Sequence, residues 1–370
     1  MSNAYLTCPY NDLPDRAFFK KLGDRNGDIG VEPDPNLSIG PDDKIISAGS
    51  CFAARIATFI RSSGLTYLFS DDRISSDGDD VREESPAIFS LRYGNIYTTR
   101  HLVQLLRRVT GKQIINPPVA RDENGRYRNL FRPSVLSYKS EDVLRADDDA
   151  HLVNIKTMLE RATVFTFTLG LTEQWIDNET EITFPSAPGC GFGEFDPSQH
   201  TFHNSTQSEV RQELRESIDL LREVNPDLSI ILTLSPVPLV ATFTSASAVE
   251  ATFYSKSLLR QAIADVLSEM PESASPLAYF PSYEIVMNPH FISENFAPDM
   301  RSISEVGVER VMKQFRRRFV RGAVEEPAIS IGLVAQPSVA VADNKLSAGV
   351  DPVCEEENIW NAYLAKQEVD

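Results

Sequence analysis

The sequence predicts an α/β fold in which a parallel β-sheet carries helices on both faces. Short apolar runs alternate with segments of helical periodicity, and 42% of the 370 residues are hydrophobic, enough for a sizeable core. Expected strands span 44–48, 65–69, 162–169, 228–235 and 276–281. Expected helices span 51–62, 99–110, 206–223, 254–269 and 304–319. Because each strand is followed by helix-length sequence, a parallel arrangement is favoured.

The first strand and helix contain the most informative stretch of the chain. The apolar run from Lys44 breaks at Gly49, shows Ser50 and Cys51, and continues with helical periodicity. In open α/β sheets such a turn lies at the carboxyl edge, where ligands bind. A thiol there meets the positive end of the helix dipole, which favours an anionic nucleophile. The alternatives are a packed core thiol for Cys51 and a helix N-cap for Ser50.

The later strand ends add polar groups at the same predicted edge. After the strand at 162–169, Thr172 is a candidate oxyanion donor, and Glu173 is placed to orient a base or bind a sugar hydroxyl. His203 precedes a long amphipathic helix and is the preferred general base among five histidines. At the expected opening of the helix at 254–269, Tyr254 and Lys256 are suited to hold an anionic ligand. The last strand ends at two further candidates, Tyr283 and Glu284.

Three parts of the chain are expected. Residues 1–42 form an N-terminal arm packed on the core, residues 43–321 form the α/β domain, and residues 322–370 form a flexible linker with a short final helix. That helix, 356–366, is expected to dock back through Trp360 and Tyr363. Insertions at 71–98, 112–140 and 174–205 have the length of lids or binding loops, and the third contains a predicted hairpin from Trp175 to Phe184.

Composition excludes several function classes. With 36 basic and 53 acidic residues the formal net charge is −17, which argues against binding nucleic acid. The four cysteines are scattered without a CxxC pair, so neither a zinc site nor a disulfide framework is expected, and no cofactor is implied. The sequence shows no signal peptide and no membrane span, which favours the cytoplasm.

Ordered motifs along residues 10–320 resemble the GSCFA family. The family motif stands here as Gly49-Ser50-Cys51-Phe52-Ala53. Further similar segments are Arg92-Tyr93-Gly94-Asn95-Ile96-Tyr97, Phe131-Arg132-Pro133-Ser134, Thr168-Leu169-Gly170-Leu171-Thr172-Glu173-Gln174-Trp175, Phe202-His203-Asn204, Ser235-Pro236-Val237, Tyr254-Ser255-Lys256-Ser257 and Tyr279-Phe280-Pro281-Ser282-Tyr283-Glu284. The family is similar to the SGNH (GDSL-like) hydrolases, which implies a three-layer flavodoxin-like fold and the cleavage or transfer of acyl esters.

The resemblance also assigns roles by position. The hydrolase Gly-Asp-Ser block falls on Gly49-Ser50-Cys51, so the nucleophile position holds Cys51. The glycine block falls on Gly94 with Asn95 beside it, and Thr172 replaces the oxyanion asparagine. The Asp-x-x-His block falls on Asp299-Met300-Arg301-Ser302, so the histidine position holds Ser302.

These residues predict an acyl esterase or O-acyltransferase acting on a polar, carbohydrate-type ester. Cys51 or Ser50 would attack the acyl carbonyl, His203 would carry the proton, and Glu173 or Glu284 would orient the imidazole. Backbone N–H groups, Thr172 and Asn95 would stabilise the oxyanion. A cysteine nucleophile also suits an acyl thioester donor, and Trp175 and Tyr283 are candidates to stack on sugar rings. The alternative is a non-catalytic ligand-binding protein on an SGNH-like scaffold, because the usual histidine is missing.

Overall fold

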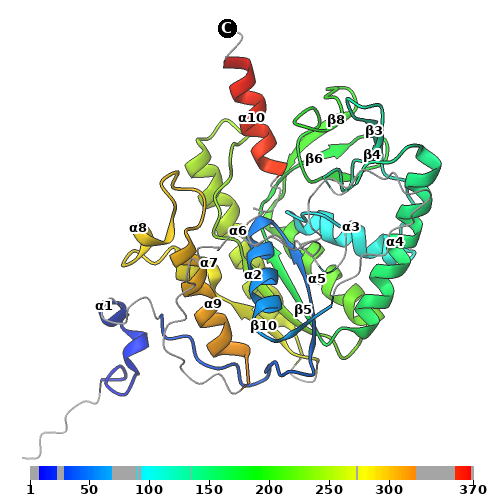
Figure 1. Cartoon of the computed structure of the whole chain (residues 1–370). Coiled ribbons are helices and arrows are strands. Elements are labelled where there is room, and N and C mark those ends of the chain that lie inside the picture. The colour runs from blue at the N-terminus through cyan, green and yellow to red at the C-terminus, as the bar shows by residue number, and fades with distance from the viewer. Residues whose placement is uncertain are drawn as a thin grey trace, which may run out of the picture.

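A five-stranded parallel sheet forms the centre of the protein. A computed structural model describes residues 8–22, 29–68, 90, 93–134, 136–271, 274–321 and 355–367. The strand order is β10-β9-β5-β1-β2, all parallel. Figure 1 shows β5 and β10 in the middle of the molecule, with helices around them. The strands are β1 (Lys44–Gly49), β2 (Thr66–Tyr67), β5 (Val164–Leu169), β9 (Ser229–Leu234) and β10 (Leu277–Phe280). All five predicted strands are present, which confirms the α/β prediction.

Helices cover both faces of this sheet. One face packs against α3 (Thr99–Val109), α4 (Glu141–Arg161), α5 (Gln207–Val224) and α6 (Ala248–Glu269). The other packs against α2 (Cys51–Ser62), α7 (Ser282–Val286) and α9 (Glu305–Phe319). The remaining helices are η1 (Asp15–Ala17), α1 (Phe19–Leu22), α8 (Ile292–Asn295) and α10 (Glu355–Gln367).

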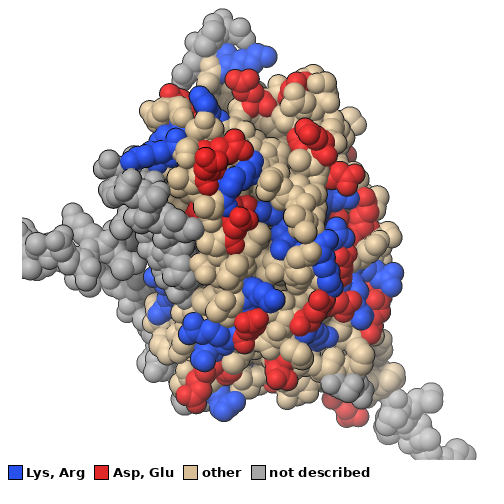
Figure 2. Space-filling view, turned by 90° about the vertical axis from the view of Figure 1, so that its right-hand side faces the viewer, with Lys and Arg blue, Asp and Glu red and all other residues tan. Residues whose placement is uncertain are grey.

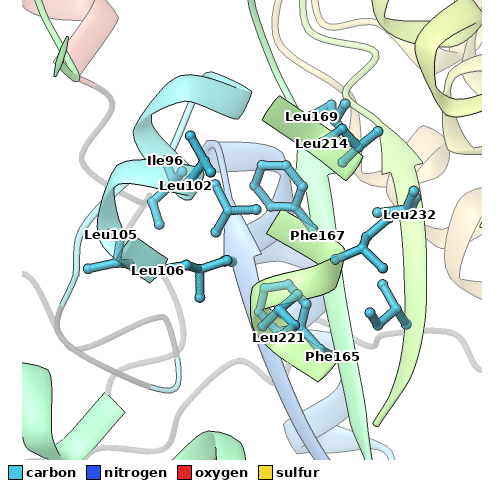
Figure 3. Packing of buried hydrophobic residues seen from close by; sticks show 14 of the residues in the cluster. Ile96, Leu102, Leu105, Leu106, Phe165, Phe167, Leu169, Leu214, Leu221 and Leu232 are labelled. Atoms are coloured by element: carbon cyan, nitrogen blue, oxygen red, sulfur yellow. The ribbon is translucent and has the colours of Figure 1, made fainter. Parts of the chain in front are cut away.

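Alternation along β5 divides the core between the two faces. Phe165 and Phe167 point to the side of α3 and α5, where leucines of both helices surround them (Figure 3). Val164 points to the opposite side and belongs to the cluster of Phe52 and Phe315. This division follows from the two-residue period of a strand whose both faces are buried. On the surface shown in Figure 2, acidic and basic groups are intermingled rather than gathered into one patch.

Two small antiparallel sheets lie outside the central one. The predicted hairpin is confirmed as β6 (Glu173–Asp177) paired with β7 (Thr183–Phe184). A third strand, β8 (His200–Asn204), pairs with β6 on its other side. His203 therefore lies in a strand and not in the expected loop, so the period of that strand fixes the direction of its side chain.

Helix α4, which periodicity did not predict, directly follows the insertion at 112–140 and contacts it. Its aspartates Asp147 and Asp148 are buried and break the apolar pattern. Arg132, in the insertion, lies 2.9 Å from Asp147, and Arg108 pairs with Asp148. The insertion also forms a hairpin of β3 (Val119–Arg121) and β4 (Tyr127–Asn129). Because breaking a buried ion pair costs about 3–5 kcal/mol, these contacts anchor the insertion and do not favour a lid.

Helix α6 begins earlier than predicted. Ser247 caps it through a reciprocal capping box with Glu250, so the helix opens at Ala248 rather than at 254. Tyr254 and Lys256 consequently lie inside the helix, and the expected anion site at its N-terminus is wrong. Tyr254 points outward and is about half exposed, whereas Lys256 is buried.

The chain ends contact the domain in a partly unexpected way. In the N-terminal segment Leu37 and Ile39 are buried, and Ile39 pairs with Val320 after α9. Helix α10 does not dock through Trp360 and Tyr363, which are 46% and 54% exposed. The described residues do not include 322–354, where the linker was expected and where Cys354 lies, or much of the insertion at 71–98, with Arg92.

The turn after β1 requires a glycine. Gly49 has φ +144°, and a Cβ there would lie 2.7 Å from the carbonyl oxygen of Thr168 and 2.9 Å from Cβ of Ala53. The neighbouring strand β5 and the first turn of α2 therefore approach the backbone as closely as a missing side chain allows.

We predict that Gly49→Ala lowers the free energy of unfolding by about 2–4 kcal/mol, because both the backbone conformation and the contacts with β5 become unfavourable. Gly64→Ala is the matched control: its φ is +77°, but no atom lies within 4 Å of the added methyl group. It should cost about 1 kcal/mol. Chemical denaturation measures both, and equal losses would contradict the packing argument.

Candidate active site

The turn between β1 and α2 presents Ser50 and Cys51 at the carboxyl edge of the sheet. Ser50 occupies the N-cap position, but its side chain makes no capping bond. Its Oγ is buried and has no hydrogen-bond partner among the described residues. The N-cap interpretation of the Ser50 side chain is therefore wrong. Cys51 begins the helix and is a partly exposed residue, whereas Ser50 is buried.

The segment 93–97 ties this turn to the end of β5. Its Ile96 N–H donates to the carbonyl oxygen of Gly49 at 2.8 Å. The carbonyl oxygen of Tyr97 accepts from the N–H groups of Gly170 and Leu171, both at 3.0 Å. Gly94 has φ +71°, and Asn95 beside it is buried. The structure thus brings predicted residues from three parts of the chain to one edge.

Lys256 reaches this edge from α6. Its Nζ donates to the carbonyl oxygen of Gly170 at 2.8 Å, and the residue is only 2% exposed. A Cβ on Gly170 would lie 3.5 Å from Cβ of Ser50, so the amine is held close to the turn. Burial lowers the pKa of Lys256 to about 8, against the opposing attraction of the negative charges of Glu356 and Cys51. A buried amine with this pKa within electrostatic reach of the Cys51 thiol is the chemically distinctive feature of the site.

A carboxylate from the last helix completes the cluster, which the sequence did not predict. Oε2 of Glu356 lies 3.1 Å from Nη2 of Arg301, and Arg301 also pairs with Glu357. Burial raises the pKa of Glu356, while Arg301, Lys256 and the N–H of Val240 favour its charged form. Arg301 stands directly before Ser302, whose hydroxyl donates to Asp299 at 2.6 Å.

An aromatic cavity of about 400 Å³ opens beside the cluster. Tyr97 and Leu171 line it from the edge of the sheet, and Glu356 and Ile359 line it from α10. Trp175 lies in a group of edge-to-face contacts with Phe195, Phe202 and Phe243 along another part of the wall. Glu173 also lies here, but its two oxygens accept from Thr242 Oγ1 and from the N–H of Phe243. Glu173 therefore fixes the loop at Thr242 and Phe243, which lines the cavity.

The structure places His203 elsewhere. It lies opposite Gln174 in the pairing of β6 and β8, whereas Trp175 lies opposite Phe202. Because successive side chains of a strand alternate, His203 points away from the wall formed by Trp175 and Phe202. Its Nε2 lies 3.0 Å from Oε1 of Glu209 in α5, the helix that flanks this side.

Other predicted site residues have structural partners. Glu284 accepts from Nε of Arg260 at 2.8 Å and from the hydroxyl of Tyr279 at 2.7 Å, next to the partly buried Tyr283. The hydroxyl of Thr172 donates to Oδ1 of Asn204 at 2.7 Å. Of the predicted residues, the structure therefore brings Ser50, Cys51, Asn95 and Lys256 together, and it does not place Glu284 or His203 with them.

Metal ligation and membrane crossing can be judged for the part of the chain that the structure describes. Within it, no three His, Cys, Asp or Glu side chains are grouped so that they could hold a metal ion. None of its helices has the length and apolar character that crossing a bilayer requires.

Comparison with known proteins identifies one family. A model described as the GSCFA family matches residues 44–315, most of the chain. No curated protein matches the sequence. Similar solved structures include a carbohydrate esterase family 3 protein from Talaromyces cellulolyticus, with 10% identity, 74% of this chain and 94% of that chain covered, and a TM-score of 0.33.

Two further structures are similar at the same level. A family 3 carbohydrate esterase from Clostridium thermocellum has 9% identity and a TM-score of 0.32, and the match covers 75% of this chain and 94% of that chain. A mutant acetyl-xylooligosaccharide esterase from Geobacillus has 14% identity and a TM-score of 0.28, and the match covers 76% of this chain and 95% of that chain. At these scores the likeness transfers no activity to this chain.

Burial of Lys256 makes stability depend on pH. Its pKa is about 8 in the folded chain and about 10.4 when unfolded, so the unfolded state binds more protons between these values. The free energy of unfolding should therefore gain about 3 kcal/mol from this residue as the pH rises from 8 to above 10. Subtracting the profile of Lys256→Met isolates that gain in denaturation experiments. Parallel profiles for the two proteins would contradict it.

Proposed function

The chain belongs to the GSCFA family, and we propose that it is an esterase-type acyl hydrolase or acyltransferase in which Cys51 is the nucleophile and Lys256 carries the proton. The observation that supports this proposal most directly is the buried amine of Lys256, which interacts with Cys51 at the first turn of α2. A cation beside a thiol at a helix start favours the thiolate, which is the reactive form. Lys256 thus takes the role first given to His203.

In the first half of the proposed reaction, the Cys51 thiolate forms a bond to the acyl carbon of the ester. The bond from that carbon to the alcohol oxygen then breaks, and the leaving oxygen takes a proton from the ammonium of Lys256. The product is an acyl thioester on Cys51 and a neutral amine on Lys256.

In the second half, a water molecule attacks the thioester carbon and gives its proton to the Lys256 amine. The carbon–sulfur bond breaks, and the thiolate and the ammonium are restored. An alcohol in place of water gives acyl transfer with the same balance. A free thioester can replace the ester as the acyl donor, because its thiol leaving group accepts the same proton.

The oxyanion of each tetrahedral intermediate needs donors near Cys51. The first N–H groups of a helix have no acceptor within the helix, and those at the start of α2 are therefore the preferred donors. Asn95, in the segment bonded to Gly49 and Gly170, is the preferred side-chain donor. Thr172 is less suited, because its hydroxyl donates to Asn204.

The aromatic cavity supports a substrate with a ring or an acyl chain beside a polar ester. Trp175 and Tyr97 provide flat surfaces of the kind on which sugar rings stack, and Leu171 in the same wall directly follows Gly170, whose carbonyl oxygen binds Lys256. A carbohydrate-type ester is therefore the preferred substrate class.

The first prediction concerns the identity of the nucleophile. Cys51→Ala should lower kcat for 4-nitrophenyl acetate by at least about 1,000-fold, because the covalent intermediate cannot form. Ser50→Ala is the matched control and should retain most activity. If Ser50→Ala is inactive and Cys51→Ala is active, Ser50 is the nucleophile.

The second prediction concerns thiol reactivity. In iodoacetamide labelling resolved by peptide mass spectrometry, Cys51 should react at lower pH than the exposed Cys8 and than Cys190, whose pKa burial raises. Lys256→Met should shift the Cys51 profile toward higher pH, because it removes the neighbouring cation. An inert Cys51 in the folded protein would instead support the alternative of a non-catalytic binding protein.

A further inference from the structure

Two cations from separate elements act on a single carboxylate, one through an ion pair and one through its charge alone. Arg301 comes from the loop before α9, and Lys256 comes from α6. Arg301 lies 3.1 Å from Oε2 of Glu356, and the charge of the same carboxylate attracts the ammonium of Lys256 from farther away. The side chains of Arg301 and Glu356 are 17% and 8% exposed, so this charge group is largely removed from water.

The carboxylate comes from a helix that touches the domain mainly through its first turn. In α10 Glu356 is buried, and Asn358 approaches Gly191. Farther along, Trp360, Tyr363 and Leu364 are all more than 40% exposed. Figure 1 shows α10 rising from the top of the molecule with its C-terminal end directed away. A helix held by so few buried contacts opens at a low free-energy cost.

Helix α10 also lines the aromatic cavity. Glu356 and Ile359 form part of its wall, together with residues at the sheet edge such as Tyr97 and Leu171. The amine that Glu356 attracts is the one that interacts with Cys51. A negative group at the position of Glu356, in the wall of this cavity, would therefore be attracted by Lys256 as Glu356 is.

We propose that Lys256 and Arg301 form a binding site for the carboxylate of an acidic ester or thioester, and that Glu356 fills this site as an internal competitor until α10 is displaced. An arginine fork binds a carboxylate through directed N–H groups, and a buried ammonium adds a point charge. The inference rests on the proposed function, because it names the substrate class of the Cys51 site. It adds that the substrate bears a carboxylate and that α10 blocks its access.

The opposite interpretation is that Glu356 is a positioning residue that holds Lys256 for catalysis. Both interpretations use the same contacts, but they predict opposite effects of neutralising Glu356 on the reaction of Cys51 with anionic reagents. If Glu356 competes with the substrate, its neutralisation opens the site to anions. If Glu356 positions Lys256, its neutralisation weakens the reaction of Cys51 with every reagent.

The test compares two alkylating agents of similar size on the full chain. Iodoacetate carries a carboxylate and iodoacetamide does not, and with both the Cys51 sulfur forms a bond to carbon as iodide leaves. In Glu356→Gln, and in Glu356→Gln combined with Glu357→Gln, the ratio of the iodoacetate rate to the iodoacetamide rate at Cys51 should rise about tenfold over wild type. Circular dichroism confirms that each variant is folded.

Two controls assign the effect to the site. Glu305→Gln removes one negative charge from an exposed ion pair with Arg55 and should leave the ratio unchanged. Adding Arg301→Gln to Glu356→Gln should return the ratio to the wild-type value. A ratio within twofold of wild type in both Glu356 variants, or slower reaction with both reagents, would overturn the proposal.

A binding measurement separates this proposal from the proposed function. Succinate, titrated calorimetrically into the full-length Glu356→Gln protein, should bind, and wild type and the variant that also carries Arg301→Gln should bind at least about tenfold more weakly. Lack of succinate binding by Glu356→Gln refutes the carboxylate site even if Cys51 hydrolyses esters. Binding together with an inert Cys51 keeps the carboxylate site and refutes the nucleophile.

Discussion

The burial of the Lys256 ammonium is the constraint on which the rest of the site depends. An unpaired charge in the interior is strongly unfavourable, so the amine needs partners that stabilise the ammonium, or a lowered pKa that favours the neutral form. The carbonyl oxygen of Gly170 accepts its hydrogen bond, and the same peptide's N–H is bonded to Tyr97. The positions of β5, α6 and the segment at 93–97 are thus linked through one peptide group, and Glu356 adds α10 to that link.

Elements whose buried positions hold mainly apolar side chains were predictable from the sequence. Strands β1, β5 and β9 are buried along almost their whole length, and turn residues bound them, so periodicity and length located them. Strand β2 has only two residues and was located by the apolar residues around it. Helix α4 was missed because Asp147 and Asp148 lie on its buried side, where arginines from distant segments neutralise them. The start of α6 was missed because Val249 and Phe253 in its first turns are exposed, and so no apolar stripe marks them.

The site was predictable only where it follows from topology. Strand ends of a parallel sheet meet at one edge, so the meeting of Cys51 with the residues after β5 required no tertiary information. Arg301 and Glu356 could not be found this way, since their contact joins a loop before α9 to a helix that follows a long segment. The sequence signal for Arg301 was indirect: it stands beside Ser302, at a position where the resemblance implied a histidine.

The presence of Ser302 beside Arg301, where the resemblance implied a histidine, changes which group at this edge can exchange a proton. A histidine can exchange a proton near neutral pH, whereas an arginine remains charged and can only bind. Ser302, at the histidine position, donates its hydroxyl to Asp299 and cannot act as a base near neutral pH, so in the proposed reaction the buried amine of Lys256, with a pKa of about 8, carries the proton. Two cations then face one small space. A carboxylate is needed there whenever both are charged, and Glu356 and an acidic substrate cannot supply it at the same time.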